Sequence, residues 1–123
     1  MDWSNKKVLI AEDEEANYLL LVEYLESTGI QIFRATDGYE VLNIVANEKP
    51  DLILMDMKMP RMTGYEAVKI IRETDSKIPI IAQTAYAMVG DDEKILEVGC
   101  NEYLPKPIDE ESLVKTVTKY LSS

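Results

Sequence analysis

The chain has no histidine, a single cysteine and no long apolar run. Without histidine, the polypeptide cannot use His-based acid–base catalysis, bind metal through His or carry a phosphohistidine of its own. Cys100 has no partner for a disulfide, so we expect it to be buried and the compartment to be reducing. No stretch approaches the roughly 20 apolar residues that span a bilayer, and residues 1–7 lack the apolar core of a signal peptide. We therefore expect a cytoplasmic protein without direct membrane contact.

Basic residues are also scarce. The 123 residues include 13 Lys and Arg against 23 Asp and Glu, a net charge of −10. Because this charge repels DNA, RNA and anionic lipid, we expect no nucleic-acid partner. The length suits a single domain over residues 1–123 with a hydrophobic core of its own.

Short apolar runs recur along the chain and predict strands at 8–11, 32–35, 52–55, 80–82 and 103–104. Most are uninterrupted, which is typical of parallel strands covered on both faces, whereas 32–35 alternates and is expected at a sheet edge. Apolar residues at helical spacing follow each run, with Gly29 and Gly99 as C-terminal stops and Asp109 as an N-cap. Five strands alternating with five helices predict a doubly wound α/β domain.

Reactive side chains stand where four of these runs end. Glu12 and Asp13 follow the first run, Asp56 the third, Thr84 the fourth and Lys106 the fifth. Parallel strands end at one edge of the sheet, so we expect these side chains to meet. Adjacent carboxylates repel unless a cation joins them, and Mg²⁺ favours oxygen ligands and phosphate. The pattern predicts Mg²⁺-assisted phosphoryl transfer to Asp56, with Lys106 and Thr84 binding the phosphoryl oxygens.

Over essentially its whole length, the chain resembles the receiver domains of two-component response regulators. The residues that carry the resemblance are Glu12-Asp13, Asp56 with the following Met59-Pro60 and Gly64, Thr84-Ala85 and Lys106-Pro107. The resemblance implies a (βα)5 flavodoxin-like fold, a parallel sheet of strand order 2-1-3-4-5, and Asp56 as phosphoacceptor. Residues 78–87 and 99–107 are more similar to the receivers of hybrid sensor histidine kinases than to those of DNA-binding regulators.

The resemblance also implies roles for the neighbours of Asp56. Asp13 and Asp56 would bind Mg²⁺ directly, Glu12 would act through water, and the backbone carbonyl of Lys58 would be a further ligand. Lys106 would contact the phosphoryl group together with the threonine hydroxyl. The Lys106–Pro107 peptide bond would be cis, a conformation that proline makes accessible.

The implied function is that of a phosphoacceptor in a two-component phosphorelay. The donor or recipient would be the phosphohistidine of a histidine kinase or a histidine phosphotransfer domain. The domain would catalyse its own Mg²⁺-dependent phosphorylation and dephosphorylation without turning over a separate substrate. Movement of Thr84 and Tyr103 would then switch a surface formed by the fourth helix, fifth strand and fifth helix, which could also form a homodimer.

Other interpretations remain open on the residues alone. Glu12 and Asp13 could simply favour the positive N-terminus of a helix, and Tyr103 could be an ordinary core residue. An aspartyl-phosphate phosphatase would need an acid where Lys58 stands. A flavodoxin-type FMN site would need a Gly- or Ser-rich first loop, and a phosphorylation-independent interaction module could share the fold. Lys58 and Tyr86, two residues after Asp56 and Thr84, predict slow self-dephosphorylation.

Overall fold

A computed structural model describes residues 2–85 and 91–122 as one α/β layer structure. The strands are β1 Lys7–Ala11, β2 Gln31–Ala35, β3 Leu52–Asp56, β4 Ile80–Thr84 and β5 Glu102–Pro105. The helices are α1 Glu15–Leu25, the 3-10 helix Glu26–Thr28, α2 Gly38–Glu48, α3 Gly64–Thr74, α4 Asp91–Val98 and α5 Glu110–Leu121. All paired strands are parallel, in the order β2-β1-β3-β4-β5. This confirms the doubly wound fold and the edge position of the second strand.

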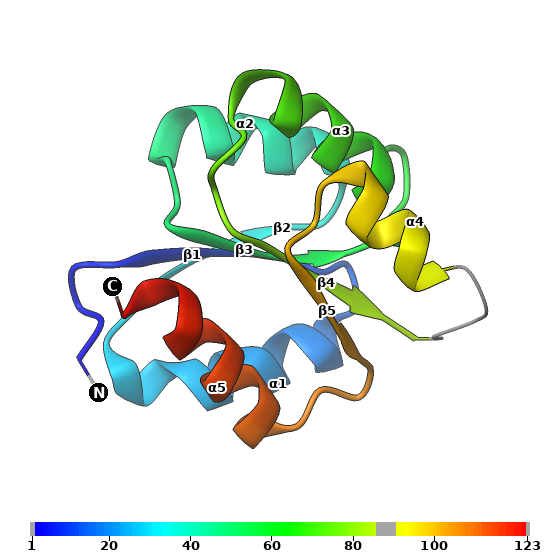
Figure 1. Cartoon of the computed structure of the whole chain (residues 1–123). Helices are drawn as coiled ribbons and strands as arrows, with labels where there is room; N and C mark the ends of the chain where they lie inside the picture. Colours follow the sequence, from blue (N-terminus) through cyan, green and yellow to red (C-terminus); the bar gives the residue numbers. More distant parts are fainter. Residues whose placement is uncertain (1, 86–90, 123) are drawn as a thin grey trace.

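Helices cover both faces of the sheet. The helices α2, α3 and α4 lie on one side, and α1 and α5 lie on the other (Figure 1). Each side has its own hydrophobic cluster, because successive residues of a strand point to opposite faces. All five residues of β3 are buried, as expected for the central strand of a sheet covered on both sides. None of the described helices is both long and apolar enough to cross a membrane.

The predicted helix ends are present, with one addition. Asp109 caps α5 by accepting a hydrogen bond from the backbone N–H of Ser112 at 3.0 Å. Gly29 has a φ of 78° and ends the first helical segment as predicted, but it caps a short 3-10 helix at Glu26–Thr28 that lies between Gly29 and α1. Gly99 follows α4 with a φ of 125°. The sequence did not predict the 3-10 helix, which is continuous with α1 and has no stop signal before it.

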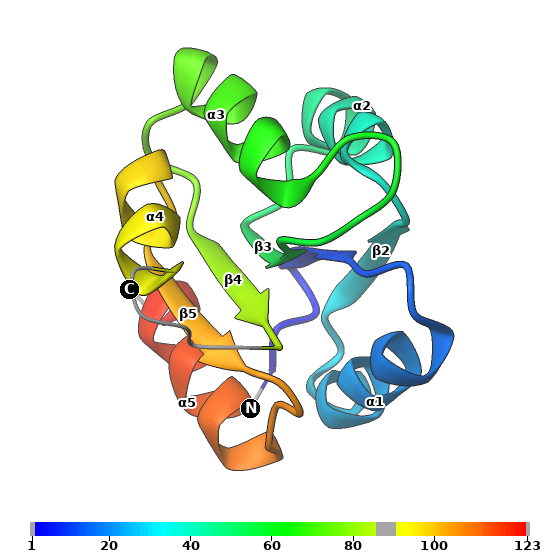
Figure 2. The ribbon, with the colours of Figure 1, turned by 90° about the vertical axis from the view of Figure 1, so that its right-hand side faces the viewer.

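Hydrogen bonds tie the C-terminal end of α4 to its neighbours. Arg72 of α3 donates from Nε to the carbonyl oxygen of Gly99 at 2.9 Å and from Nη2 to Oδ1 of Asn101 at 3.0 Å. The same Oδ1 accepts the N–H of Ile80, the first residue of β4, at 2.8 Å. The turned view of Figure 2 shows α4 beside β5, with β4 and β5 running in the same direction. One asparagine thus joins α3, β4 and the turn that follows α4.

Candidate functional site

A cleft of about 320 Å³ opens where the strands of the sheet end. Its lining contains all six residues that the sequence analysis assigned to the site, namely Glu12, Asp13, Asp56, Lys58, Thr84 and Lys106. Asp56 and Thr84 are the last residues of β3 and β4, and Lys106 follows β5 directly. The parallel topology therefore brings together residues that are far apart in the sequence.

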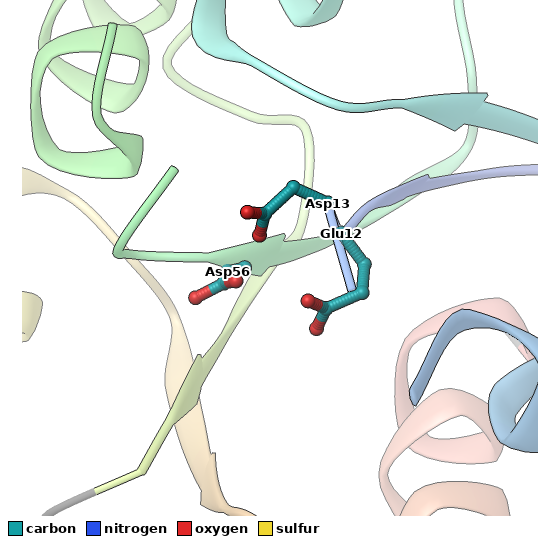
Figure 3. A group of neighbouring side chains, drawn as sticks. All are labelled: Glu12, Asp13 and Asp56. Carbon is teal, nitrogen blue, oxygen red and sulfur yellow. The ribbon is translucent and has the colours of Figure 1, made fainter. Parts of the chain in front are cut away.

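Three carboxylates form the acidic part of the cleft. Glu12 and Asp13 follow β1, and they lie beside Asp56 at the end of β3 (Figure 3). Each offers one oxygen atom, and these atoms lie within 4.8 Å of one another. Glu12 is 0% and Asp56 5% exposed, whereas Asp13 is exposed to solvent. A group of hard oxygen ligands, part buried and part open to water, fits Mg²⁺, which retains several water ligands.

Lys106 bridges two of these carboxylates. Its Nζ lies 2.9 Å from Oε1 of Glu12 and 3.3 Å from Oδ2 of Asp56. Burial lowers the pKa of Lys106, but the hydrogen bond to Glu12 and the two negative charges outweigh it and raise the pKa overall. The ammonium group therefore stays protonated, and one cation serves both carboxylates.

Burial dominates the electrostatics of Asp56. It raises the pKa of the carboxyl from 3.8 to about 7, and the charge of Glu12 acts in the same direction. The backbone N–H of Lys58 opposes this by donating to Oδ1 at 3.0 Å, and Lys106 opposes it by its charge. An ionised Asp56 is thus costly here without a further cation, which also fits a metal-binding site.

The contacts that hold Glu12 were missed by sequence reasoning. The Oε1 atom of Glu12 accepts a hydrogen bond from Nδ2 of Asn17 in α1, and its Oε2 accepts one from the backbone N–H of Glu14 at 3.1 Å. The backbone carbonyl oxygen of Glu12 accepts a hydrogen bond from Nε of Arg34 at 3.2 Å. Asn17 also donates to Oε1 of Gln83 at 3.0 Å. A signal was present: Asn17 shares the buried face of α1 with two leucines, and Gln83 extends an apolar strand.

The remaining expected features have different outcomes. The Lys106–Pro107 peptide bond is cis, and the carbonyl oxygen of Thr84 accepts the Lys106 N–H at 2.7 Å. Tyr103 is half-buried and packs against the core cluster under α3 and α4. Cys100 is 5% exposed, as expected, and burial raises the pKa of its thiol to about 12. Tyr86 lies outside the described residues.

Comparisons with known proteins agree with this geometry. The family model of the response regulator receiver domain matches residues 8–118. The polar-differentiation response regulator DivK of Brucella anthropi is 40% identical over 118 residues, which are 94% of this chain and 96% of DivK.

Two solved structures are also similar. One is the receiver domain of the sensor histidine kinase PA1611 from Pseudomonas aeruginosa, with a magnesium ion coordinated in its active site cleft. It has a TM-score of 0.88 and 32% identity, covering 96% of this chain and 98% of that one. The other is the co-crystal structure of the histidine phosphotransfer protein Ypd1 and the receiver domain of Ssk1 from Saccharomyces cerevisiae. It has a TM-score of 0.87 and 33% identity, covering 94% of this chain and 88% of the matched chain.

Proposed function

Because the chain belongs to the response regulator receiver family and is a receiver domain of two-component signalling, we propose that Asp56 is the residue that it phosphorylates. The observation that carries this assignment is the position of Asp56 at the end of the central strand, 5% exposed, between a lysine and two further carboxylates. Glu12 also contacts Lys106, at 2.9 Å, but its carboxylate is 0% exposed and already accepts hydrogen bonds from Asn17 and Glu14. The reaction is Mg²⁺-dependent transfer of a phosphoryl group to this carboxylate.

The transfer is an in-line displacement on phosphorus. A carboxylate oxygen of Asp56 forms a bond to the phosphorus of a partner phosphohistidine while the P–N bond breaks, and the released imidazole nitrogen ends with a proton from solvent. Lys106 Nζ, 3.3 Å from Oδ2 of Asp56, can turn to the phosphoryl oxygens and offset their charge. The hydroxyl of Thr84, at the end of the adjacent strand β4, donates to another phosphoryl oxygen. Catalysis is therefore positioning and charge stabilisation by the domain itself.

Magnesium binding is part of the proposal. Asp13, Asp56 and the backbone carbonyl of Lys58 would hold Mg²⁺ directly, and Glu12 would bind one of its water ligands. The ion would supply the positive charge that three carboxylates and an incoming phosphoryl group require. The oxygen atoms within 4.8 Å of one another and the raised pKa of Asp56 support this assignment.

The partner we propose is a histidine kinase or a histidine phosphotransfer protein, as donor or recipient of the phosphoryl group. Residues 1–123 contain no histidine, so the phosphohistidine must lie outside this receiver domain. The similarity to a receiver solved with Ypd1 supports a partner of that class. We further propose that residues 1–123 act as a single receiver domain in the cytoplasm, where kinases have access to ATP. A homodimer through α4, β5 and α5 is the oligomer to test by light scattering before and after phosphorylation.

The experiment is measurement of the intact mass after incubation with Mg²⁺ and acetyl phosphate or phosphoramidate. We expect one phosphoryl adduct on the wild type and none on Asp56→Asn or in the presence of a chelator. Asp51→Asn is a matched control, because Asp51 immediately precedes the other end of β3 and should leave the adduct unchanged.

An adduct that persists in Asp56→Asn would overturn the assignment of the phosphoacceptor. No adduct on the wild type despite bound Mg²⁺ would favour a phosphorylation-independent interaction module. Turnover of a phosphomonoester substrate would instead indicate a phosphatase.

A further inference from the structure

We propose that Asn17 and Gln83 form a positioning pair that holds the Glu12 carboxylate in place for divalent-cation binding in the cleft. The proposal rests on the proposed function of this site and adds two residues to it. Neither residue would touch the cation or the phosphoryl group. Both would act through Glu12.

The two amides form a chain that ends at the carboxylate. Asn17 Nδ2 donates one hydrogen bond to Glu12 Oε1 and a second to Gln83 Oε1 at 3.0 Å. Because a carboxylate accepts hydrogen bonds and cannot donate them when ionised, the NH₂ group of Asn17 must face Glu12. Gln83 must then present its oxygen to the remaining proton of that NH₂ group. The orientation of both amides is therefore fixed by Glu12.

All three side chains are buried, so the geometry is held by packing as well as by hydrogen bonds. Glu12 and Gln83 are 0% and Asn17 is 8% exposed. Asn17 belongs to α1 and Gln83 to β4, so the hydrogen bond between them joins this helix to a strand that ends at the cleft. Alternation along β4 directs Gln83 and Thr84 to opposite faces of the strand. The amide chain thus anchors the strand end beneath the residue that faces the phosphoryl group.

Folding stability alone does not account for Gln83. Its Nε2 is buried and has no hydrogen-bond partner among the described residues. An unpaired buried donor is destabilising, and an apolar side chain of similar shape would avoid that cost. Only Oε1 of the Gln83 amide makes a hydrogen bond, and this bond fixes the orientation of the Asn17 side chain. The amide is therefore better explained by what it positions than by what it stabilises.

The pair matters most when Lys106 changes partner. Glu12 Oε1 accepts hydrogen bonds from both Asn17 and Lys106, whose Nζ lies 2.9 Å away. When Lys106 turns to a phosphoryl group on Asp56, Asn17 remains as a donor to that oxygen. A neutral amide can hold the carboxylate without reducing its negative charge, which leaves the charge available to the cation and its water ligands.

The test compares Gln83→Met, Asn17→Leu and the double variant with the wild type. Gln83→Met removes the acceptor and the unpaired donor with little change in volume, and Asn17→Leu removes both hydrogen bonds. The matched control is Asn47→Leu, which breaks a similar amide–amide bond, from Nδ2 to Asn43 Oδ1 at 2.9 Å, on the exposed surface of α2. Three quantities are measured: urea stability without Mg²⁺, the Mg²⁺ dissociation constant by calorimetry, and the rate of phosphorylation by acetyl phosphate against Mg²⁺ concentration.

We expect Mg²⁺ binding to weaken about tenfold in Gln83→Met and at least as much in Asn17→Leu, as for other residues that orient metal ligands. The Mg²⁺ concentration for half-maximal phosphorylation should rise by the same factor, while the rate at saturating Mg²⁺ stays within about twofold of wild type. Gln83→Met should be about as stable as wild type, because it removes one unpaired donor but leaves one proton of the Asn17 amide without its acceptor. Asn47→Leu should match wild type in its Mg²⁺ binding. If Asn17→Leu does not fold, Gln83→Met carries the test.

Mg²⁺ affinities equal to wild type in folded variants would overturn the positioning role while leaving the proposed function intact. A fall in the saturated rate with unchanged Mg²⁺ affinity would also overturn it, because the pair would then act on the chemistry directly. A wild type that binds no Mg²⁺ would overturn the proposed function and this inference together. A wild type that binds Mg²⁺ but gains no adduct would overturn the function alone, since the calorimetric comparison still stands.

Discussion

Replacing Asp56 with asparagine should stabilise the metal-free protein at alkaline pH. Burial raises the pKa of Asp56 from 3.8 to about 7. The folded state therefore binds a proton that the unfolded state releases, and stability from this group is lost as the pH rises from 4 to above 7. A difference of about 3 pKa units corresponds to about 4 kcal/mol at pH 8. This figure already includes the attraction of Lys106, which lowers the pKa.

The assay is urea or thermal unfolding of wild type and Asp56→Asn in chelator at pH 4, 5, 6, 7 and 8. We expect the variant to be more stable by up to about 4 kcal/mol at pH 8, by about 2 kcal/mol at pH 5 and by little at pH 4. For a chain of this length, the difference at pH 8 corresponds to a rise in Tm of roughly 15 °C. Asp13→Asn is the control, and it should gain less because Asp13 is exposed.

Saturating Mg²⁺ should reduce the difference in stability between Asp56→Asn and wild type, because binding stabilises the folded wild type by mass action and the variant lacks one ligand. A variant no more stable than wild type at pH 8 would refute the reasoning. So would a stability difference that does not change between pH 5 and pH 8, because the gain would then not come from a titrating carboxyl.

Three further predictions concern other parts of the fold. Lys106→Met should destabilise the metal-free protein by about 3 kcal/mol in urea unfolding, since it leaves Glu12 buried without its cation. Lys119→Met removes an exposed ion pair and should cost under about 1 kcal/mol. Equal losses of stability in the two variants would contradict the prediction for Lys106. Gly64→Ala should lower both Tm and phosphorylation rate, because its Cβ would lie 2.5 Å from the backbone oxygen that ends β3; an unchanged Tm would show that the loop adjusts freely. The thiol of Cys100, with a pKa near 12, should react with a disulfide reagent at pH 8 only as fast as the protein unfolds, and a fast reaction in the native state would disprove its burial.

The fold could be predicted because the composition of each strand reflects how deeply the strand is buried. Uninterrupted apolar runs such as 52–55 and 80–82 indicate strands covered on both faces, and the alternating run 32–35 indicates an edge. The strands are one or two residues longer than predicted, because polar residues such as Asp56 and Thr84 pair with a neighbouring strand although they also line the cleft. Hydropathy alone cannot distinguish a residue that ends a strand from one that follows it.

The sequence also allowed us to predict which residues line the cleft, but not the hydrogen bonds that support them. Parallel strands end at the same edge of the sheet, so the order of the elements alone predicted that Asp56 and Lys106 would lie in one cleft. The link between Asn17 and Gln83 depends on the angle of α1 against β4, which no local pattern specifies. Each amide is visible as a polar residue in an apolar position. Only the packed structure shows that the two amides satisfy each other.

The hydrogen bonds around Asn101 and Arg72 also limit how α4 can move. They fix the C-terminal end of the helix to α3 and β4. A rearrangement that keeps these bonds must rotate α4 about that end, so displacement grows toward its first turn. Over eight residues, a rotation of roughly 10° moves the first turn by about 2 Å. Asn101 would then be the pivot of this rotation, and the largest motion would occur at the N-terminal end of α4, which is the end closest in sequence to Thr84.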